Sequence, residues 1–270
     1  MVQVEDLKSI LIEPPVVEDE ETSSPESNLG SQHASFMFGY HSSNVNMLAL
    51  HPDFERARSY WGIYKENVDP LLKLIHVPSD EPRILEAMEY PEKISKGMEC
   101  LLFAIYYGTI TSISPDECQD RFKEEREALL QKYRFGMEQA LARANFLFCE
   151  ETIVLQSFVI FLVLLRRNDD ARIIWTLTGL VVRMAQTLGL HRDGSHFKLT
   201  PFEVEMRRRF WWQVMILDMR ASEDHGCDPS IVESQFDTKM VYPTATRLSV
   251  VQTLTVNSLL TSMTRILILT

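Results

Sequence analysis

Hydrophobic positions recur at steps of three and four over most of residues 36–224, and no sustained strand-like alternation interrupts them. One such amphipathic stripe covers residues 129–148, and another covers residues 173–188. Between them, residues 153–165 are apolar almost all round, as expected of a helix buried at the centre of a bundle. The pattern predicts an all-α protein, a layered helical bundle whose order begins near residue 36.

The same short motif marks two helix starts. Residues 114–117 (Ser-Pro-Asp-Glu) and 200–203 (Thr-Pro-Phe-Glu) each place a hydroxyl at the N-cap, a proline at the first helical position and a glutamate at the third. We expect both to form capping boxes, and the first to open the long helix that carries the first stripe. Gly189 is expected to end the helix that carries the second stripe by adopting the left-handed conformation, with Leu190 packing back onto that helix.

Three consecutive arginines, Arg207 to Arg209, raise the question of nucleic-acid binding. Glu203 precedes Arg207 by four residues and Glu205 precedes Arg209 by four, which is the favourable order for ion pairs along a helix. The same helix carries an apolar face that begins at Phe210. We therefore predict a structural role for the arginines.

The charge balance points the same way. The chain has 38 acidic and 27 basic residues and a formal net charge of −11, which argues against a grip on phosphates by clustered cations. Much of the acidity falls in residues 1–35, whose Glu, Ser, Pro and Gly content is typical of a disordered acidic tail. The scattered apolar residues of this tail fit an activation or docking segment that folds on binding, or a plain linker.

The four cysteines, Cys100, Cys118, Cys149 and Cys227, show neither metal-binding spacing nor the framework of a small secreted domain. We interpret them as reduced thiols of an intracellular protein. The first residues lack the positive and apolar regions of a signal peptide, and the apolar run at 153–165 is too short to cross a bilayer. We expect a soluble protein with no membrane partner.

Two groups of polar residues offer weak signals of chemistry. Asn168, Asp169 and Asp170 have the composition of a magnesium site, but the next helical turn adds no carboxylate. We predict that Asn168 and Asp169 cap the following helix. His225 and Cys227 would be a catalytic pair only if the fold brought their side chains together.

His191, Asp193 and His196 lie in a glycine-flanked loop, where a carboxylate could orient a general base. Loop capping explains these residues without the nucleophile or metal partner that catalysis would need. The chain contains no Walker loop, dinucleotide-binding glycine motif, nucleophile elbow or zincin motif. We therefore predict a protein that is not an enzyme, with no catalytic, cofactor-binding or metal-binding residues and no cofactor in this chain. An all-α metabolic enzyme is the rival hypothesis.

A third hypothesis is a ligand-sensing module. Its pocket would lie among five aromatic residues, namely Phe103, Tyr106, Tyr107, Phe158 and Phe161. Aromatic residues at helical spacing more often form ordinary core, which is the alternative.

An ordered series of segments extends beyond these single motifs. In the second half it consists of Leu155-Gln156-Ser157, Trp175, Val182 to Gly194 (VRMAQTLGLHRDG), Phe202-Glu203, Glu205 to Trp212 (EMRRRFWW) and Leu217-Asp218. Upstream it includes His51-Pro52, Tyr64 to Leu71 (YKENVDPL), His76-Val77-Pro78, Leu101 to Tyr107 (LLFAIYY) and Glu138 to Leu141 (EQAL). Across residues 36–240 this series resembles the fungal-specific transcription factor domain, the middle homology region of fungal zinc-cluster regulators.

The resemblance implies a nuclear regulator of transcription with an all-helical regulatory domain. In that family an N-terminal module binds DNA through six cysteines that hold two zinc ions, and a linker and a short coiled-coil dimerisation segment follow it. The resemblance therefore implies protein partners, a homodimer or a heterodimer with a full-length regulator, and a small-molecule effector. Residues 220–224 (RASED) and 236–239 (FDTK) also resemble regulators found beside secondary-metabolite gene clusters.

Two departures from the family pattern change these expectations. The six-cysteine cluster is absent, so DNA and zinc are partners only through a missing cluster; the alternative is a stand-alone modulator that acts by protein contacts or small-molecule sensing. Residues 241–270 form an atypical apolar, Ser/Thr-rich tail. We therefore expect an incomplete version of a larger helical domain, from a truncated or mis-spliced gene model or from a true short variant. Such a domain would expose an apolar patch and oligomerise.

Overall fold

The computed structural model describes residues 45–168 and 171–241. All regular structure in this part of the chain is helical, which confirms the all-α prediction. The α-helices are α3 (Phe54–Asn67), α4 (Asp69–Leu72), α5 (Val77–Glu89), α6 (Lys96–Ser112), α7 (Pro115–Phe122), α8 (Arg126–Arg143), α9 (Thr152–Leu165), α10 (Ala171–Thr187) and α11 (Pro201–His225). Short 3₁₀ turns occur at η2 (Met47–Leu50), η3 (Pro91–Lys93), η4 (Gly194–His196) and η5 (Glu233–Gln235).

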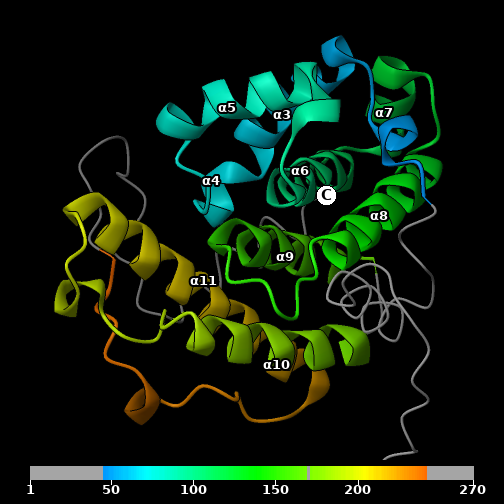
Figure 1. Ribbon diagram of the computed structural model, residues 1–270. Helices are drawn as coiled ribbons and strands as arrows, with labels where there is room; N and C mark the ends of the chain where they lie inside the picture. Colours follow the sequence, from blue (N-terminus) through cyan, green and yellow to red (C-terminus); the bar gives the residue numbers. More distant parts are fainter. Residues whose placement is uncertain (1–44, 169–170, 242–270) are drawn as a thin grey trace, which may run out of the picture.

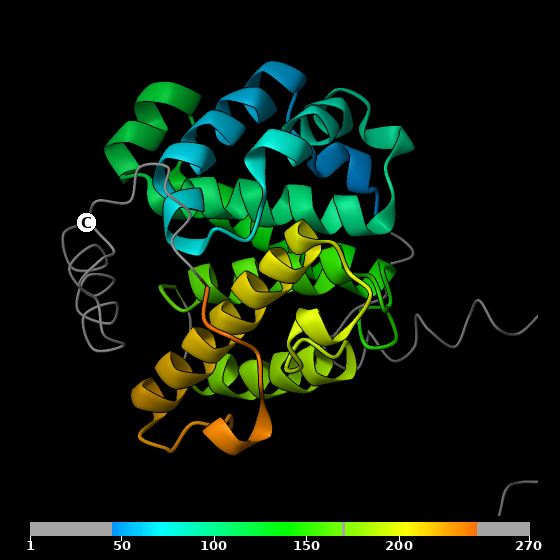
Figure 2. The same cartoon turned by 90° about the vertical axis from the view of Figure 1, so that its left-hand side faces the viewer.

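The helices stack in layers around α6 and α9. Helix α6 packs against α3, α5, α8 and α9, and α9 in turn contacts α10 and α11. In Figures 1 and 2, α3, α4 and α5 lie on one side of α6, and α10 and α11 lie together beyond α9. Every residue from Gly97 to Thr111 in α6 is buried. Helix α6 is thus the centre of the first layer, and α9 joins that layer to the α10–α11 pair.

Helix α9 confirms the prediction of a central buried helix. Its apolar residues face the core on nearly all sides, and Ser157 donates to the carbonyl of Ile153 at 2.7 Å within the helix itself. The side chain of Gln156 donates to the carbonyl of Leu74, so this polar group ties α9 to the segment after α4. None of the helices in the described residues is long and apolar enough to cross a membrane.

The motif at 114–117 opens a shorter helix than predicted. Ser114 caps α7 by accepting from the backbone N–H of Glu117 at 3.1 Å, but the Glu117 carboxylate pairs with Arg121 at 3.0 Å instead of returning to the cap. Helix α7 ends at Phe122 because Lys123 adopts the left-handed conformation, with φ of 58°. The prediction of one long helix through the first stripe is therefore wrong, and α8 begins afresh at Arg126.

The end of that stripe also differs from the prediction. Helix α8 stops at Arg143, and Asn145 turns the chain with a positive φ of 49°. Phe148 lies beyond this turn and is 65% exposed, so it does not belong to the buried face.

The predicted start of α11 at Thr200 and the predicted end of α10 at Gly189 are both confirmed. Thr200 accepts from the Glu203 N–H at 3.3 Å, and the Glu203 carboxylate accepts from the Thr200 N–H at 2.7 Å, which completes the capping box of α11. Gly189 has φ of 67°, and Leu190, fully buried, donates its N–H to the carbonyl of Ala185 at 2.9 Å. Helix α10 therefore ends as its sequence predicts.

The proposed aromatic pocket is not present. Phe103, Tyr106, Tyr107, Phe158 and Phe161 are each at most 1% exposed. They pack edge-on against one another and against neighbouring rings, as Tyr107 does on Phe161 with centroids 5.1 Å apart. These residues fill the core instead of lining a cavity.

Candidate functional site

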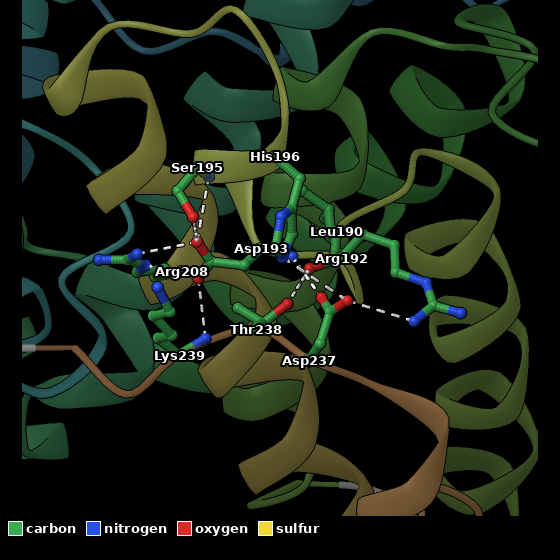
Figure 3. A network of polar contacts seen from close by, with 9 residues as sticks. All are labelled: Leu190, Arg192, Asp193, Ser195, His196, Arg208, Asp237, Thr238 and Lys239. Carbon is green, nitrogen blue, oxygen red and sulfur yellow. Dashed lines mark hydrogen bonds and ion pairs between the residues drawn. The ribbon is translucent and has the colours of Figure 1, made fainter.

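The loop between α10 and α11 is organised around one buried carboxylate. Asp193 is fully buried, and the guanidinium of Arg208 in α11 donates to both of its oxygens, from Nε and from Nη2, at 2.8 Å each. The backbone N–H groups of Ser195 and Lys239 donate to the same carboxylate at 3.0 and 2.8 Å. Figure 3 shows these groups converging on Asp193 from three separate segments.

A second carboxylate extends this network to the segment after η5. Asp237 accepts from the backbone N–H of Asp193 at 2.7 Å and from Arg192 at 3.3 Å, and it donates its own N–H to the His191 carbonyl at 3.1 Å. The hydroxyl of Thr238 donates to the carbonyl of Leu190 at 2.8 Å. Residues 236–239 are thereby tied across the turn between α10 and α11 (Figure 3).

The electrostatics of this network fit an anchor. The Arg208 guanidinium holds the pKa of Asp193 well below its usual range, although burial alone would raise it. The backbone N–H of Asp193 lowers the pKa of Asp237 in the same way, whereas burial lowers the pKa of His191. A general base needs a pKa near the working pH and room to accept a proton. Asp193 has neither, so the geometry supports loop capping and not proton transfer.

The three consecutive arginines each have a structural partner. Arg207 donates to the carbonyls of Leu188 and Gly189 at 3.1 and 2.8 Å, which satisfies the end of α10. Arg209 pairs with Glu205 at 3.0 Å, as predicted. The predicted pairing of Arg207 with Glu203 is wrong, because the Glu203 carboxylate is taken by the N-cap of its own helix.

Among the described residues, the remaining candidates do not converge on a reactive centre. Asp169 and Asp170 lie outside the described residues, and the Asn168 side chain donates to the Tyr107 hydroxyl at 3.1 Å. The His225 ring stacks on Trp175, with centroids 4.6 Å apart, and Cys227 Sγ lies 3.9 Å from the backbone carbonyl of His225 and not against its ring. Within residues 45–168 and 171–241, no group of His, Cys, Asp and Glu side chains is arranged to hold a metal ion.

The structure also contains a hollow that no sequence motif indicates. It has a volume of about 540 Å³ and lies where the α3–α4 corner, the end of α6, the end of α9 and the middle of α11 meet. Its floor is apolar and includes Leu72 and Leu217, while Gln213, Arg167 and Arg220 add polar groups. Because these residues come from helices far apart in the chain, local sequence patterns carry no signal for them.

Three of the segments that carry the family resemblance meet at the Asp193 network. Residues 189–194, 207–212 and 236–239 are distant in sequence, yet each supplies a donor or an acceptor to this one cluster. Trp212 adds a further bond by donating from Nε1 to the Lys239 carbonyl at 2.9 Å. This part of the resemblance therefore coincides with one physical unit, which fixes how α10, α11 and the following segment pack.

Comparisons with known proteins identify the same family as the resemblance. The family profile of the fungal-specific transcription factor domain matches residues 59–257. The chain is 41% identical over 186 residues to the aurofusarin cluster transcription factor aurR2 of Gibberella zeae, covering 69% of this chain and 28% of that protein. It is 35% identical over 194 residues to the pyriculol/pyriculariol biosynthesis cluster transcription factor 1 of Pyricularia oryzae, covering 72% and 26%. Identity to the C6 finger domain transcription factor nscR of Aspergillus fumigatus is 35% over 181 residues, covering 66% and 23%.

The chain thus spans about a quarter of the length of these curated relatives. No solved structure matches it. The family match runs into residues 241–257, the first part of the segment that was expected to depart from the family. With the match covering most of the chain, the protein belongs to the fungal-specific transcription factor domain family.

Proposed function

We propose that this chain is the regulatory helical domain of a nuclear transcription regulator that controls a secondary-metabolite gene cluster. The observation that carries the proposal is the similarity to regulators whose names specify such clusters, at 41% identity in one case. The domain regulates through contacts with proteins or effectors and not through catalysis. The use of Asp193 and the three arginines as structural anchors supports this role.

DNA contact in this proposal belongs to a zinc cluster outside this chain. Several relatives are named C6 finger domain transcription factors, whereas this sequence has four scattered cysteines and a net charge of −11. The cluster and its zinc would be supplied by the intact regulator or by a full-length dimer partner. We expect the isolated chain to bind duplex DNA no more tightly than an acidic control protein at physiological salt.

Deleting the coding region in its fungal host and sequencing RNA tests the proposal. We expect the transcripts of one contiguous group of biosynthetic genes to change, and a fluorescent fusion to accumulate in the nucleus. Restoring the deletion with residues 1–270 alone, or with the longest transcript of the locus, separates a stand-alone modulator from a domain of a longer regulator. If no contiguous gene group responds in either background, the proposal is wrong.

A further inference from the structure

We propose that the hollow between α4, α6, α9 and α11 binds a small organic acid with a flat apolar body. Its use as an effector site rests on the proposed regulatory function, but the binding itself does not. The volume of about 540 Å³ falls within the usual range for small-molecule pockets, about 300–1,000 Å³.

The inner lining suits an apolar body. Val68 and Leu72 enter from the α3–α4 corner, Leu164 from α9, and Ile216 and Leu217 from α11. Polar groups contribute only a small part of the surface of the hollow. An aromatic skeleton that displaces water from these side chains gains about 25 cal/mol per Å² of buried apolar area.

One side chain in this lining is held only weakly. The Gln213 amide nitrogen lies 3.5 Å from the Leu71 carbonyl, at the limit of a hydrogen bond, and its Oε1 is shielded from solvent with no hydrogen-bond partner among the described residues. A buried acceptor left unpaired is costly, and the terminal torsion of an amide is soft. A hydroxyl or N–H on the ligand can therefore draw Oε1 towards it without breaking a good bond.

The rim favours an anion. Arg166, Arg167 and Arg220 line it, against Glu66 as the one acidic residue in the lining. Arg166 forms two hydrogen bonds with the Asp224 carboxylate, and Arg220 pairs with Glu223 at 2.9 Å. Arg167 is exposed just beyond the end of α9, so its guanidinium is the rim cation that we expect to bind the anion. Guanidinium groups bind carboxylate and sulfonate oxygens with several parallel N–H donors. The ligand class is therefore an aromatic carboxylate, phenolate or comparable acid.

The site can be tested with 8-anilinonaphthalene-1-sulfonate, an aromatic anion whose fluorescence rises in apolar surroundings. We expect one saturable site on the full chain. Arg167→Glu should lower the affinity for this probe about tenfold, which corresponds to about 1.4 kcal/mol of binding free energy. Arg183→Glu is the matched control, because Arg183 is also exposed, on α10, but does not line the hollow. It should leave the affinity unchanged.

Two further measurements distinguish binding in the hollow from binding elsewhere on the surface. Ile216→Trp fills the hollow and should abolish binding while the circular dichroism spectrum stays that of the parent. The neutral analogue N-phenyl-1-naphthylamine should bind more weakly and respond equally to both arginine variants. Equal affinity of the sulfonate for all variants, or several weak sites, would overturn the proposal. So would a dimer that dissociates in Ile216→Trp, because a second copy would then be the occupant.

These binding results are independent of the gene-expression experiment. Binding without a transcriptional phenotype would keep the site and remove its regulatory role. A transcriptional phenotype without binding would keep the proposed function and remove the site.

Discussion

Arg208 holds Asp193 with both prongs of its guanidinium, from Nε and from Nη2, each 2.8 Å from a carboxylate oxygen. The carboxylate is fully buried, and the arginine side chain is 13% exposed. Asp193→Asn keeps the shape of the side chain but removes its charge, which leaves the guanidinium without its ionic partner. We expect the free energy of unfolding to fall by about 3 kcal/mol.

Urea titration at pH 7 measures this loss. Glu205→Gln is the control, because the Arg209–Glu205 pair lies on the same helix with side chains 23% and 24% exposed. Breaking that pair should cost about 0.5 kcal/mol. Similar losses for the two variants would contradict the special role of the buried pair.

The stability difference between the parent protein and Asp193→Asn should depend on pH, because the pKa of Asp193 is lowered in the folded protein. A depressed folded pKa gives stability that is fully present above the unfolded pKa, about 3.9, and that is lost progressively as the pH falls below it. The difference in unfolding free energy between the parent and Asp193→Asn should therefore be constant from pH 7 to pH 5 and shrink towards pH 2. An unchanged difference at pH 3 would refute the assignment.

Glycine-to-alanine substitutions should have opposite effects at two helical sites. A Cβ at Gly136 in α8 would lie 2.5 Å from the ring of Phe103, which is fully buried and has no room to move. We expect Gly136→Ala to destabilise the protein by about 2 kcal/mol. At Gly179 in α10 a Cβ meets nothing within 4 Å, so Gly179→Ala should stabilise it by about 0.8 kcal/mol through helix propensity. Thermal and urea unfolding of both variants check the signs, and a stabilised Gly136→Ala would show that α6 and α8 pack less closely.

The N-cap of α11 should be a measurable part of stability. Thr200→Ala removes the acceptor for the Glu203 N–H and should lower the free energy of unfolding by about 1 kcal/mol. Thr200→Ser keeps a hydroxyl at this position and should retain most of that stabilisation. Thr176 in α10 is an exposed threonine whose hydroxyl donates only to the Arg172 carbonyl one turn earlier. Thr176→Ala should therefore be neutral or slightly stabilising. A serine variant as weak as the alanine variant would show that the hydroxyl is not the stabilising group.

Thiol labelling should divide the four cysteines by burial. Cys227 is exposed and Cys149 is partly buried, whereas Cys100 and Cys118 are buried and burial raises the pKa of both thiols. With 5,5′-dithiobis(2-nitrobenzoate) at pH 8, Cys227 should react first and Cys149 more slowly. Cys100 and Cys118 should react only as the protein unfolds. Cys227→Ser should remove the fast phase, and four fast thiols in native buffer would contradict the packing of α6 and α7.

The sequence predicted those parts of the fold that depend on local chemistry. Glycine at 189 specifies a helix end through its backbone freedom, and the Thr-Pro-Phe-Glu motif at 200–203 specifies a helix start through side chains that cap nearby N–H groups; both are confirmed. Lys123 ends its helix without such a rule. A lysine in the left-handed conformation has no sequence signature, so the break between α7 and α8 was not visible in the hydrophobic pattern.

The candidate site was only partly visible in sequence for a different reason. Asp193 stood out in its loop, but its main partners, Arg208 and Lys239, are 15 and 46 residues away. Glu203, four residues before Arg207, obeyed the spacing rule for an ion pair and yet turned back to its own N-cap. The hollow beside Gln213 is assembled from four separate parts of the chain, which no local period can reveal.

The complete burial of α6 constrains how this fold can diversify. Every residue from Gly97 to Thr111 is packed against other side chains, so α6 has no surface for a new specificity except at its end, where Thr111 and Ser112 line the hollow. Substitutions within α6 therefore act mainly through how well the new side chain packs in the core. In this chain, a substitution that adds a new contact without disturbing the core must therefore lie on the outer helices or around the hollow.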